Sequence, residues 1–238
     1  MAKIFTSLQR QNLSGQVVHE IALSIMRRDF KPGDTLASEP ELSLQFNVSR
    51  PVMRESLKIL SAKGLIESRP RTGTKVRPRA DWNILDPEVI GWMYEVGPDR
   101  AFLDALCEVR LMFEPTAARL AAARATDKEI KTIEECYRRM EEGVGAPETY
   151  IPADMAFHAA ICAAAHNEML QKITETLTTS LHLSRVVTSH LPGANLAAMP
   201  PHRAVAEAIR QGDEQAAEEA MRKLVILTTD DIQRALEQ

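Results

Sequence analysis

The spacing of apolar residues beyond residue 98 restricts the fold more than any other feature of this sequence. Apolar residues recur every three to four positions, the period of an amphipathic helix, and no convincing strand-like alternation interrupts them. The segment 189–201, with three prolines and one glycine, is expected to be the longest irregular stretch. We therefore predict an all-helical bundle, with helices at approximately 99–124, 127–143, 148–166, 168–190, 200–211 and 213–237.

Charge divides the chain near residue 80. Residues 1–80 hold 14 Lys and Arg against 7 Asp and Glu, a net charge of +7, whereas residues 81–238 hold 15 against 26, a net charge of −11. A basic segment joined to an acidic one indicates two domains, of which only the first meets a polyanion. We predict a DNA-binding domain at 1–80, a linker with a short connecting helix at 81–98, and a ligand-binding and dimerisation domain at 99–238.

The composition also restricts where the protein works. No apolar run approaches the roughly 18–20 residues of a membrane span, and the N-terminal segment lacks the apolar core of a signal peptide. The three cysteines are far apart and form no CxxC pair, so we interpret them as buried thiols in a reducing compartment. A cytoplasmic protein without a membrane partner is expected.

The basic segment has the pattern of three helices and a hairpin. A helical period runs through 14–29, and Ser38 with Glu41 forms a capping box that begins a second helix. Ser49, with its hydroxyl as the expected cap, begins a third helix that ends at Gly64. Two short runs around "PRTG" can then pair as a hairpin. This order predicts a winged helix-turn-helix, so the whole chain is expected to be mostly α.

The third helix has two distinct faces. Met53, Leu57 and Leu60 form an apolar face, while Arg50, Arg54 and Lys58 form a basic stripe. Such a stripe is often only a solvated surface. In a winged helix, however, this helix enters the DNA major groove, where arginine is suited to bidentate contact with guanine. We therefore expect the stripe to face phosphates and base edges.

The segment 34–76 contains "NVSRPVMRESL" followed by "KGLIES". This segment resembles the DNA-binding domain of GntR-family bacterial transcription regulators. The resemblance implies DNA contacts by Ser49, Arg50, Arg54 and Arg71. It also implies a homodimer on a palindromic, double-stranded operator. One departure is that Pro40 occupies a position where the family often has a DNA-contacting arginine, so that contact is lost or moved.

The candidate ligand chemistry of the second domain lies in "ADMAFHAAICAAAHNEML". Asp154 and His158 are four residues apart and project from one helix face, which Ile161 continues into the apolar interior. His202 begins a later helix. Asp, His and His inside a helical bundle suit a divalent metal, although an Asp–His pair at this spacing also serves as a simple hydrogen-bonded pair.

These segments resemble the FCD effector domain of the FadR subfamily of GntR regulators. The resemblance implies a metal held by Asp154, His158 and His202, with Zn, Ni or Mn as candidates, and a small carboxylate that completes its coordination. The family's fourth ligand, a histidine, is replaced by Leu224. The segment "DWNILDPEVIGWMYE" further resembles the linker of subfamily members that regulate sugar-acid catabolism, which implies a small organic or sugar acid as effector.

Two further arginines are candidates for effector binding. Arg110 lies on the buried side of its predicted helix, where it suits a bidentate clamp on a carboxylate or a structural ion pair with Glu114. Arg185 and His190, with Ser184, precede the irregular segment. These three residues either line the mouth of a pocket or are ordinary polar surface residues.

The patterns together predict a ligand-responsive transcription regulator, most simply a repressor, and not an enzyme. Two alternatives belong to other classes. Two histidines and a carboxylate are also the ligands of non-haem iron oxygenases, which would make this a metalloenzyme. Alternatively, the helical bundle serves only for dimerisation, with Asp154 and His158 as a core pair.

Overall fold

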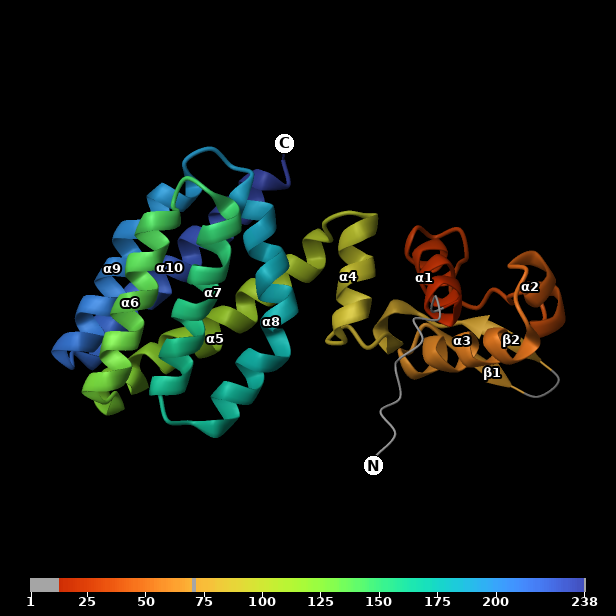
Figure 1. Ribbon diagram of the computed structural model, residues 1–238, viewed down its shortest axis with the longest axis horizontal. Helices are drawn as coiled ribbons and strands as arrows, with labels where there is room; N and C mark the ends of the chain where they lie inside the picture. The colour runs from red at the N-terminus through yellow and green to blue at the C-terminus, as the bar shows by residue number, and fades with distance from the viewer. Residues whose placement is uncertain (1–12, 70–71, 238) are drawn as a thin grey trace, which may run out of the picture. The chain divides into compact units, whose positions relative to one another are not determined.

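The structure, a computed structural model, describes residues 13–69 and 72–237 (Figure 1). The chain divides into two compact units, the first reaching Gly97 and the second beginning at Pro98. Among the described residues, no helix is both long and apolar enough to cross a membrane.

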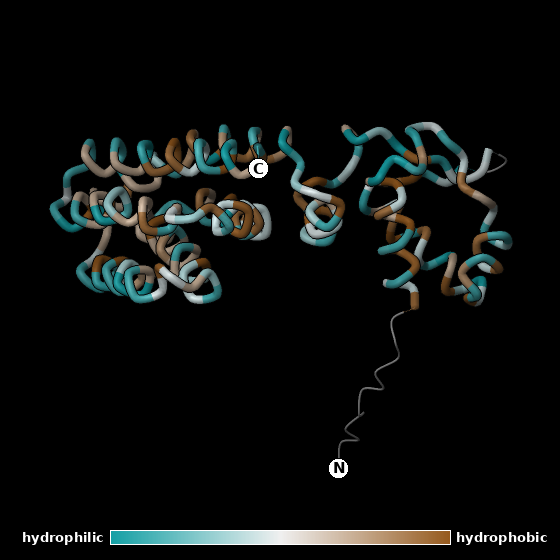
Figure 2. The backbone as a smooth tube through the Cα atoms, turned by 90° about the horizontal axis from the view of Figure 1, so that it is seen from above, coloured by the Kyte–Doolittle hydropathy of each residue, from teal (hydrophilic) through white to brown (hydrophobic). Residues whose placement is uncertain are grey.

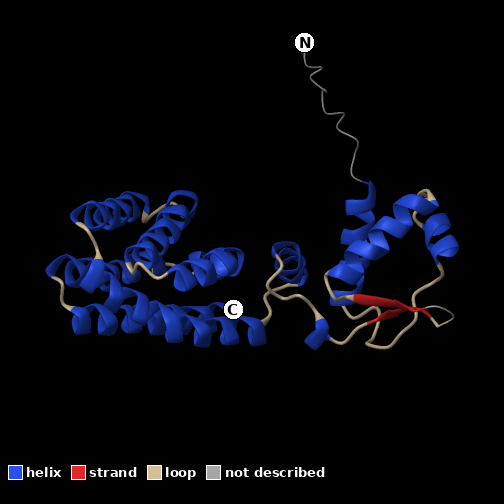
Figure 3. Cartoon of the chain, turned by 90° about the horizontal axis from the view of Figure 1, so that it is seen from below, coloured by secondary structure: helices blue, strands red, loops and turns tan. Residues whose placement is uncertain are grey.

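The first unit has the predicted order of three helices followed by a hairpin. A two-stranded antiparallel sheet, the wing, pairs Ile66 with Val76 and Arg69 with Gly73 (Figure 3). A one-turn 3-10 helix and a further helix complete the unit. The elements are α1 (Leu13–Met26), α2 (Glu39–Gln45), α3 (Arg50–Ala62), β1 (Ile66–Arg69), β2 (Gly73–Val76), η1 (Arg79–Asp81) and α4 (Pro87–Val96). The prediction of a winged helix-turn-helix is confirmed.

Helix α3 packs through its apolar face as predicted, since Met53 and Leu60 are completely buried. Asn47, in the turn before it, has a φ of 50°, a left-handed conformation that asparagine tolerates. Pro51 lies in the first turn, where its missing N–H costs nothing. The predicted cap is confirmed in its position but not in its hydrogen bond. Ser49 is the N-cap residue, but its hydroxyl makes no capping hydrogen bond.

A buried lysine ties α4 to the end of α3. The Nζ atom of Lys63 lies 2.8 Å from both carboxylate oxygens of Asp86 and 2.6 Å from a carboxylate oxygen of Glu88. Asp86 also caps α4 by accepting hydrogen bonds from the N–H groups of residues 88 and 89. Helix α4 additionally packs on α1. The connecting helix is therefore held by the first unit.

The second unit is a bundle of long helices, as the apolar period predicts. Helix α10 packs on α5 and α9, and α6 packs on α7. Along each of these helices, hydrophobic and hydrophilic segments alternate (Figure 2), and the hydrophobic faces form one core that includes Phe157, Ile161 and Ile209. The helices are α5 (Arg100–Arg124), α6 (Asp127–Gly143), α7 (Pro147–Ala164), α8 (Glu168–Ser189), α9 (Ala194–Gln211) and α10 (Glu214–Ala235).

One predicted boundary is wrong. Helix α9 begins at Ala194, so most of the segment 189–201 is helical and both Pro200 and Pro201 lie inside the helix. Gly193, with a φ of 78°, makes the turn that precedes it. Neither proline has an N–H to donate to the carbonyl four residues earlier, so α9 lacks two internal hydrogen bonds at this point. The early start matters because it places Ala198, whose carbonyl contacts Nδ1 of His202, in the same helix.

The turn after α3 provides a test of the fold. Gly64 has a φ of 78°, and a Cβ atom built on it would lie 2.2 Å from the carbonyl oxygen of Asp81. Gly33 also has a positive φ, of 91°, but a Cβ atom there would meet nothing within 4 Å. Gly33→Ala should therefore cost only the backbone strain of about 1–3 kcal/mol, and Gly64→Ala should cost distinctly more. Chemical denaturation of the two variants measures the difference, and equal losses would contradict the close approach.

Candidate functional site

The basic stripe of α3 is exposed, as predicted. Arg50 makes no hydrogen bond or ion pair within the described part of the chain. The guanidinium of Arg54 binds Glu39 through two contacts, at 3.0 and 3.2 Å, and Lys58 lies 4.0 Å from Glu55. Arg71 falls outside the described residues. Three cations are thus displayed along one side of α3, and one of them is held in place by a carboxylate of α2.

A groove of about 410 Å³ separates α3 from the wing. Arg54 and Lys58 stand on its helical side, and Arg69 stands on the wing side. Basic side chains on both walls are suited to a phosphate backbone. The remaining lining residues are Glu39, Leu57, Ser61, Ser68, Gly73 and Thr74.

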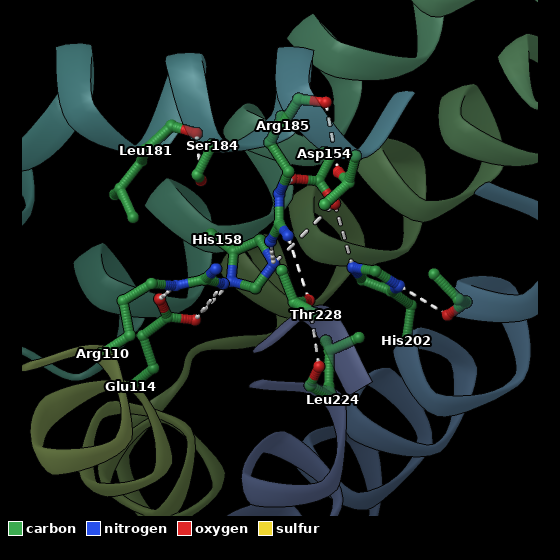
Figure 4. A network of polar contacts seen from close by, with 12 residues as sticks. Arg110, Glu114, Asp154, His158, Leu181, Ser184, Arg185, His202, Leu224 and Thr228 are labelled. Atoms are coloured by element: carbon green, nitrogen blue, oxygen red, sulfur yellow. Dashed lines mark hydrogen bonds and ion pairs between the residues drawn. The ribbon is translucent and has the colours of Figure 1, made fainter. Parts of the chain in front are cut away.

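The second unit contains a buried network of charged side chains, centred on Asp154 of α7 (Figure 4). Asp154 is 1% exposed. Its Oδ2 atom accepts a hydrogen bond of 2.5 Å from Nε of Arg185 on α8. Its Oδ1 atom lies 3.1 Å from Nε2 of His202 on α9 and 3.9 Å from Nε2 of His158. Three helices therefore bring their polar groups to one carboxylate.

Arg185 distributes its guanidinium over three partners. Besides its contact with Asp154, Nη2 donates to Nε2 of His158 at 3.0 Å, and Nη1 donates to the hydroxyl of Thr228 on α10 at 3.1 Å. The Thr228 hydroxyl in turn donates to the carbonyl of Leu224. Every nitrogen of this guanidinium is used inside the protein.

The contacts of the two histidines define which ring nitrogens carry protons. An arginine can only donate, so Nε2 of His158 accepts, and the proton of the neutral ring is on Nδ1, 2.9 Å from Oε2 of Glu114. Nδ1 of His202 lies 2.7 Å from the carbonyl of Ala198 and must carry the proton there. The Nε2 atoms of both rings face Asp154, and that of His158 is unprotonated.

A second ion pair borders the first. Nε of Arg110 on α5 lies 2.5 Å from Oε1 of Glu114, one helical turn further on. Both side chains are buried, with 1% and 3% of their surface exposed. The salt-bridge interpretation of Arg110 is therefore supported, yet it leaves part of the guanidinium unused. Nη1 of Arg110 is buried and has no hydrogen-bond partner.

The pKa values of these groups follow from burial and from their neighbours. Burial by itself would raise the pKa of Asp154, but Arg185 and the two histidines hold it far below its usual range. Burial would likewise raise the pKa of Glu114, which Arg110 and His158 instead keep far below its usual range. Burial lowers the pKa of His202, although Asp154 opposes the shift. The network consequently holds two ionised carboxylates beside two guanidinium groups.

Two cavities adjoin this network. The larger, of about 250 Å³, is bordered by Arg110, Glu114, Asp154, His158 and Arg185, and its other walls are Met155, Ala156, Ala159, Thr174, Thr178 and Leu181. The smaller, of about 20 Å³, has room for about one water molecule. Its polar lining residues include Tyr150, Asp154, Arg185, Thr188, Asn195, His202, Thr228 and Asp231. A small anion in the larger cavity would therefore reach Arg110 and Arg185.

The donor atoms of Asp154, His158 and His202 fit a metal ion in kind. One ligand atom from each lies within 4.8 Å of the others. Among the described residues, Nε2 of His202 is a buried atom without a hydrogen-bond partner, despite its proximity to Asp154. The other ring nitrogens face Glu114 and a carbonyl, as those of metal-bound histidines commonly do. Leu224 supplies no ligand atom.

The predicted site residues fall into two groups. Arg110, Asp154, His158, Arg185 and His202 form one network, so the interpretation of Arg185 as a surface residue is wrong. His190 is exposed at the end of α8 and lines neither cavity.

The sequence interpretation missed three residues of the small cavity. Tyr150 precedes Asp154 by four residues and so shares its helix face, a spacing that could have revealed it. Its buried hydroxyl has no hydrogen-bond partner, and burial raises its pKa. Thr228 and Asp231 lie on α10, and no pattern in the sequence connects them to Asp154.

Comparison with known proteins accounts for both units. Residues 13–76 match the family described as bacterial regulatory proteins, gntR family, and residues 105–226 match the FCD domain. The chain belongs to the GntR family. The first unit is therefore the DNA-binding domain of a GntR regulator, and the second is its FCD domain.

The relatives of this GntR regulator extend over most of its length. It is 33% identical to the galactonate operon transcriptional repressor of Escherichia coli, over 92% of this chain and 96% of that protein. It is 30% identical to the E. coli transcriptional regulator YieP, over 91% and 94%. The structure of Lar, which controls the Listeria monocytogenes agr system, has the same fold, with a TM-score of 0.63 at 18% identity, covering 98% of this chain and 99% of that chain.

The buried pair of Arg110 and Glu114 predicts a large effect of a single change. Glu114→Gln should destabilise the FCD domain by roughly 3 kcal/mol, because it leaves the Arg110 guanidinium buried without its counter-charge. Glu108→Gln, at an exposed position of the same helix, is the matched control and should have little effect. Urea denaturation monitored by circular dichroism measures both.

The same variant should alter the dependence of stability on pH. Because the folded pKa of Glu114 is below its unfolded value of about 4.3, its contribution is present above that value and is lost as the pH falls. The unfolding free energy of Glu114→Gln should therefore decline less steeply below about pH 4.5 than that of the parent. Parallel profiles would contradict the buried ionised pair.

Proposed function

We propose that this GntR regulator binds operator DNA through α3 and the wing, and responds to a small carboxylate held in the FCD domain. One observation carries the ligand half of the proposal. Among the described residues, the buried Nη1 of Arg110 has no hydrogen-bond partner, and Arg110 borders a cavity of about 250 Å³. A cationic donor in such a position is suited to an anionic ligand that enters from the cavity.

In the DNA-bound state, the proposed roles follow from what each side chain can reach. The side chain of Arg50, which is exposed and has no partner among the described residues, is assigned to base edges. Arg54, oriented by Glu39, can exchange that carboxylate for a base or phosphate. Lys58 and Arg71 are assigned to phosphates, and Ser49, at the start of α3, donates its unused hydroxyl. These assignments are supported by the exposure of α3 and by the match to the gntR family.

The DNA-bound form is proposed to be a homodimer on a palindromic operator. One winged helix offers few contacts, and two copies related by a two-fold axis read two half-sites at a fixed spacing. We propose that it acts in the cytoplasm as a repressor and not as an enzyme, in keeping with the named function of its relative in E. coli. A monomer in light scattering that binds one half-site as tightly as the full operator would contradict the dimer.

The effector is proposed to be a small organic or sugar acid. Its carboxylate would accept hydrogen bonds from Nη1 of Arg110 and from Arg185, while its body occupies the larger cavity. The named function of the galactonate operon repressor makes aldonic acids the first class to screen. For His190, which is exposed, the geometry gives no support for an effector contact.

Asp154, His158 and His202 are proposed to hold a divalent ion, with Zn, Ni and Mn as candidates. When bound, such an ion supplies a Lewis-acidic centre for a carboxylate or hydroxyl oxygen of the effector. With Leu224 in place of a fourth protein ligand, more positions remain open to the effector. The support is the convergence of one carboxylate oxygen and two histidine ring nitrogens among the described residues.

The DNA half of the proposal is tested on α3. Arg50→Ala should weaken specific operator binding by roughly 1–3 kcal/mol, because a base contact is lost. Arg222→Ala, which removes an exposed arginine of α10, is the control and should bind as the parent does. Fluorescence anisotropy at fixed salt measures both, and an Arg50→Ala variant with undiminished affinity would rule out this docking of α3.

The effector half is tested by removing the ion pair as a unit. The double change Arg110→Met and Glu114→Gln withdraws both charges together, so neither is left buried alone. It should bind the operator normally but fail to respond to any acid that releases the parent from DNA. The measurement is operator anisotropy during titration with aldonic acids and hydroxy acids. A double variant that still responds at the parent concentration would exclude Arg110 as the anchor.

A further inference from the structure

The acceptor atoms of Asp154 and His158 require a cation between them, and this chain carries one of its own. A carboxylate oxygen and an unprotonated ring nitrogen repel one another unless a positive charge lies beside them. In the structure that charge is Arg185, whose guanidinium is hydrogen-bonded to both Asp154 and His158. His202 completes the group, with its Nε2 atom 3.1 Å from Oδ1 of Asp154.

Arg185 uses an atom that a metal ion would also need. Nε2 of His158 has a single lone pair, which already accepts a hydrogen bond from Nη2 of Arg185 at 3.0 Å. The same lone pair cannot bind an ion at the same time. The guanidinium is 7% exposed and is anchored to Thr228 on its far side, so it does not swing freely into solvent.

We propose that Arg185 is the resident cation of the Asp154–His158–His202 site and competes with a divalent ion for it. The proposal rests on the proposed function in one respect, namely that these three residues are the metal ligands. It adds that ion binding must displace Nη2 of Arg185 from His158. The site can therefore be occupied in two ways, by the guanidinium of Arg185 or by a divalent ion.

The balance of buried charge decides how the divalent ion enters. Arg110 and Arg185 contribute two positive charges, and Glu114 and Asp154 contribute two negative charges, so the charges of these four side chains balance. A divalent ion alone would add two uncompensated charges at a buried position, which is costly. An ion that enters with a carboxylate adds only one, and the displaced Nη2 of Arg185 gains a new acceptor.

Two consequences follow for binding. In the parent protein, ion and carboxylate should each raise the affinity for the other, because each offsets the charge that the other brings. Without the positive charge of Arg185, the carboxylate of Asp154 would lack a counter-charge. A divalent ion would then bind tightly even in the absence of an effector carboxylate. Removal of Arg185 is thus expected to strengthen ion binding while it weakens the dependence of that binding on a carboxylate.

Calorimetric titration of the full chain with Ni²⁺ tests the proposal. In a buffer without carboxylates, Arg185→Met and Arg185→Gln should bind Ni²⁺ at least about tenfold more tightly than the parent, a gain of about 1.4 kcal/mol. Acetate should tighten Ni²⁺ binding to the parent by a larger factor than to either variant. Equal or weaker Ni²⁺ binding by both variants, or no Ni²⁺ binding by any form, would overturn the proposal.

Controls distinguish this site from other effects. Arg222→Met should leave the Ni²⁺ affinity unchanged, and His202→Gln added to Arg185→Met should remove the gain. Arg185→Met is expected to lose stability, so its melting temperature is measured with and without Ni²⁺. A larger rise than in the parent supports the proposal, and an equal or smaller rise counts against it.

Different results would contradict the competition at Arg185 and the proposed effector function. If Arg185→Met gains no Ni²⁺ affinity, while aldonic acids still release the parent from its operator, the competition is wrong and the effector function stands. If no acid releases the parent while the variant gains affinity, the effector function is wrong and the competition stands.

Discussion

The burial of one carboxylate is the constraint around which the FCD domain is organised. Asp154 is 1% exposed on a helix whose neighbouring residues pack in an apolar core, and an ionised carboxylate in such a place is stable only with direct partners. Those partners come from α8 and α9, and the ion pair of Arg110 and Glu114 extends the network to α5. With Thr228 of α10, which Arg185 also contacts, five helices are joined by polar contacts in addition to apolar packing.

A network of this kind is suited to report the arrival of an anion. The charges of its arginines and carboxylates balance, yet three of its nitrogen atoms have no hydrogen-bond partner among the described residues: Nη1 of Arg110, Nδ1 of His158 and Nε2 of His202. A ligand that supplies an acceptor to Arg110 alters the partners of Arg185 and, through it, the contacts between α7 and α8. A ligand shifts a conformational equilibrium only by its differential affinity for the two states, and these unsatisfied groups are where such a difference can arise.

The sequence was most informative where the determining interactions are local. The turn at Asn47, the two faces of α3, and the shared face of Asp154 and His158 all follow from spacing within one helix or one turn. The interpretation left Arg185 open between a pocket residue and a surface residue, because only the packing of α8 against α7 buries it. It failed at Pro200 and Pro201, which lie inside α9 although proline interrupts the hydrogen bonds of a helix. Thr228 reaches the network through tertiary packing that no local pattern encodes.

The central claim is that two buried arginines of the FCD domain receive the effector. The most direct measurement is NMR spectroscopy of arginine Nε–H groups, with the signals of Arg110 and Arg185 assigned by substitution, while aldonic and hydroxy acids are added. We predict two signals that exchange slowly with solvent, and that both shift with any acid that releases the protein from its operator. An acid that releases the operator but leaves both signals unchanged would contradict the account.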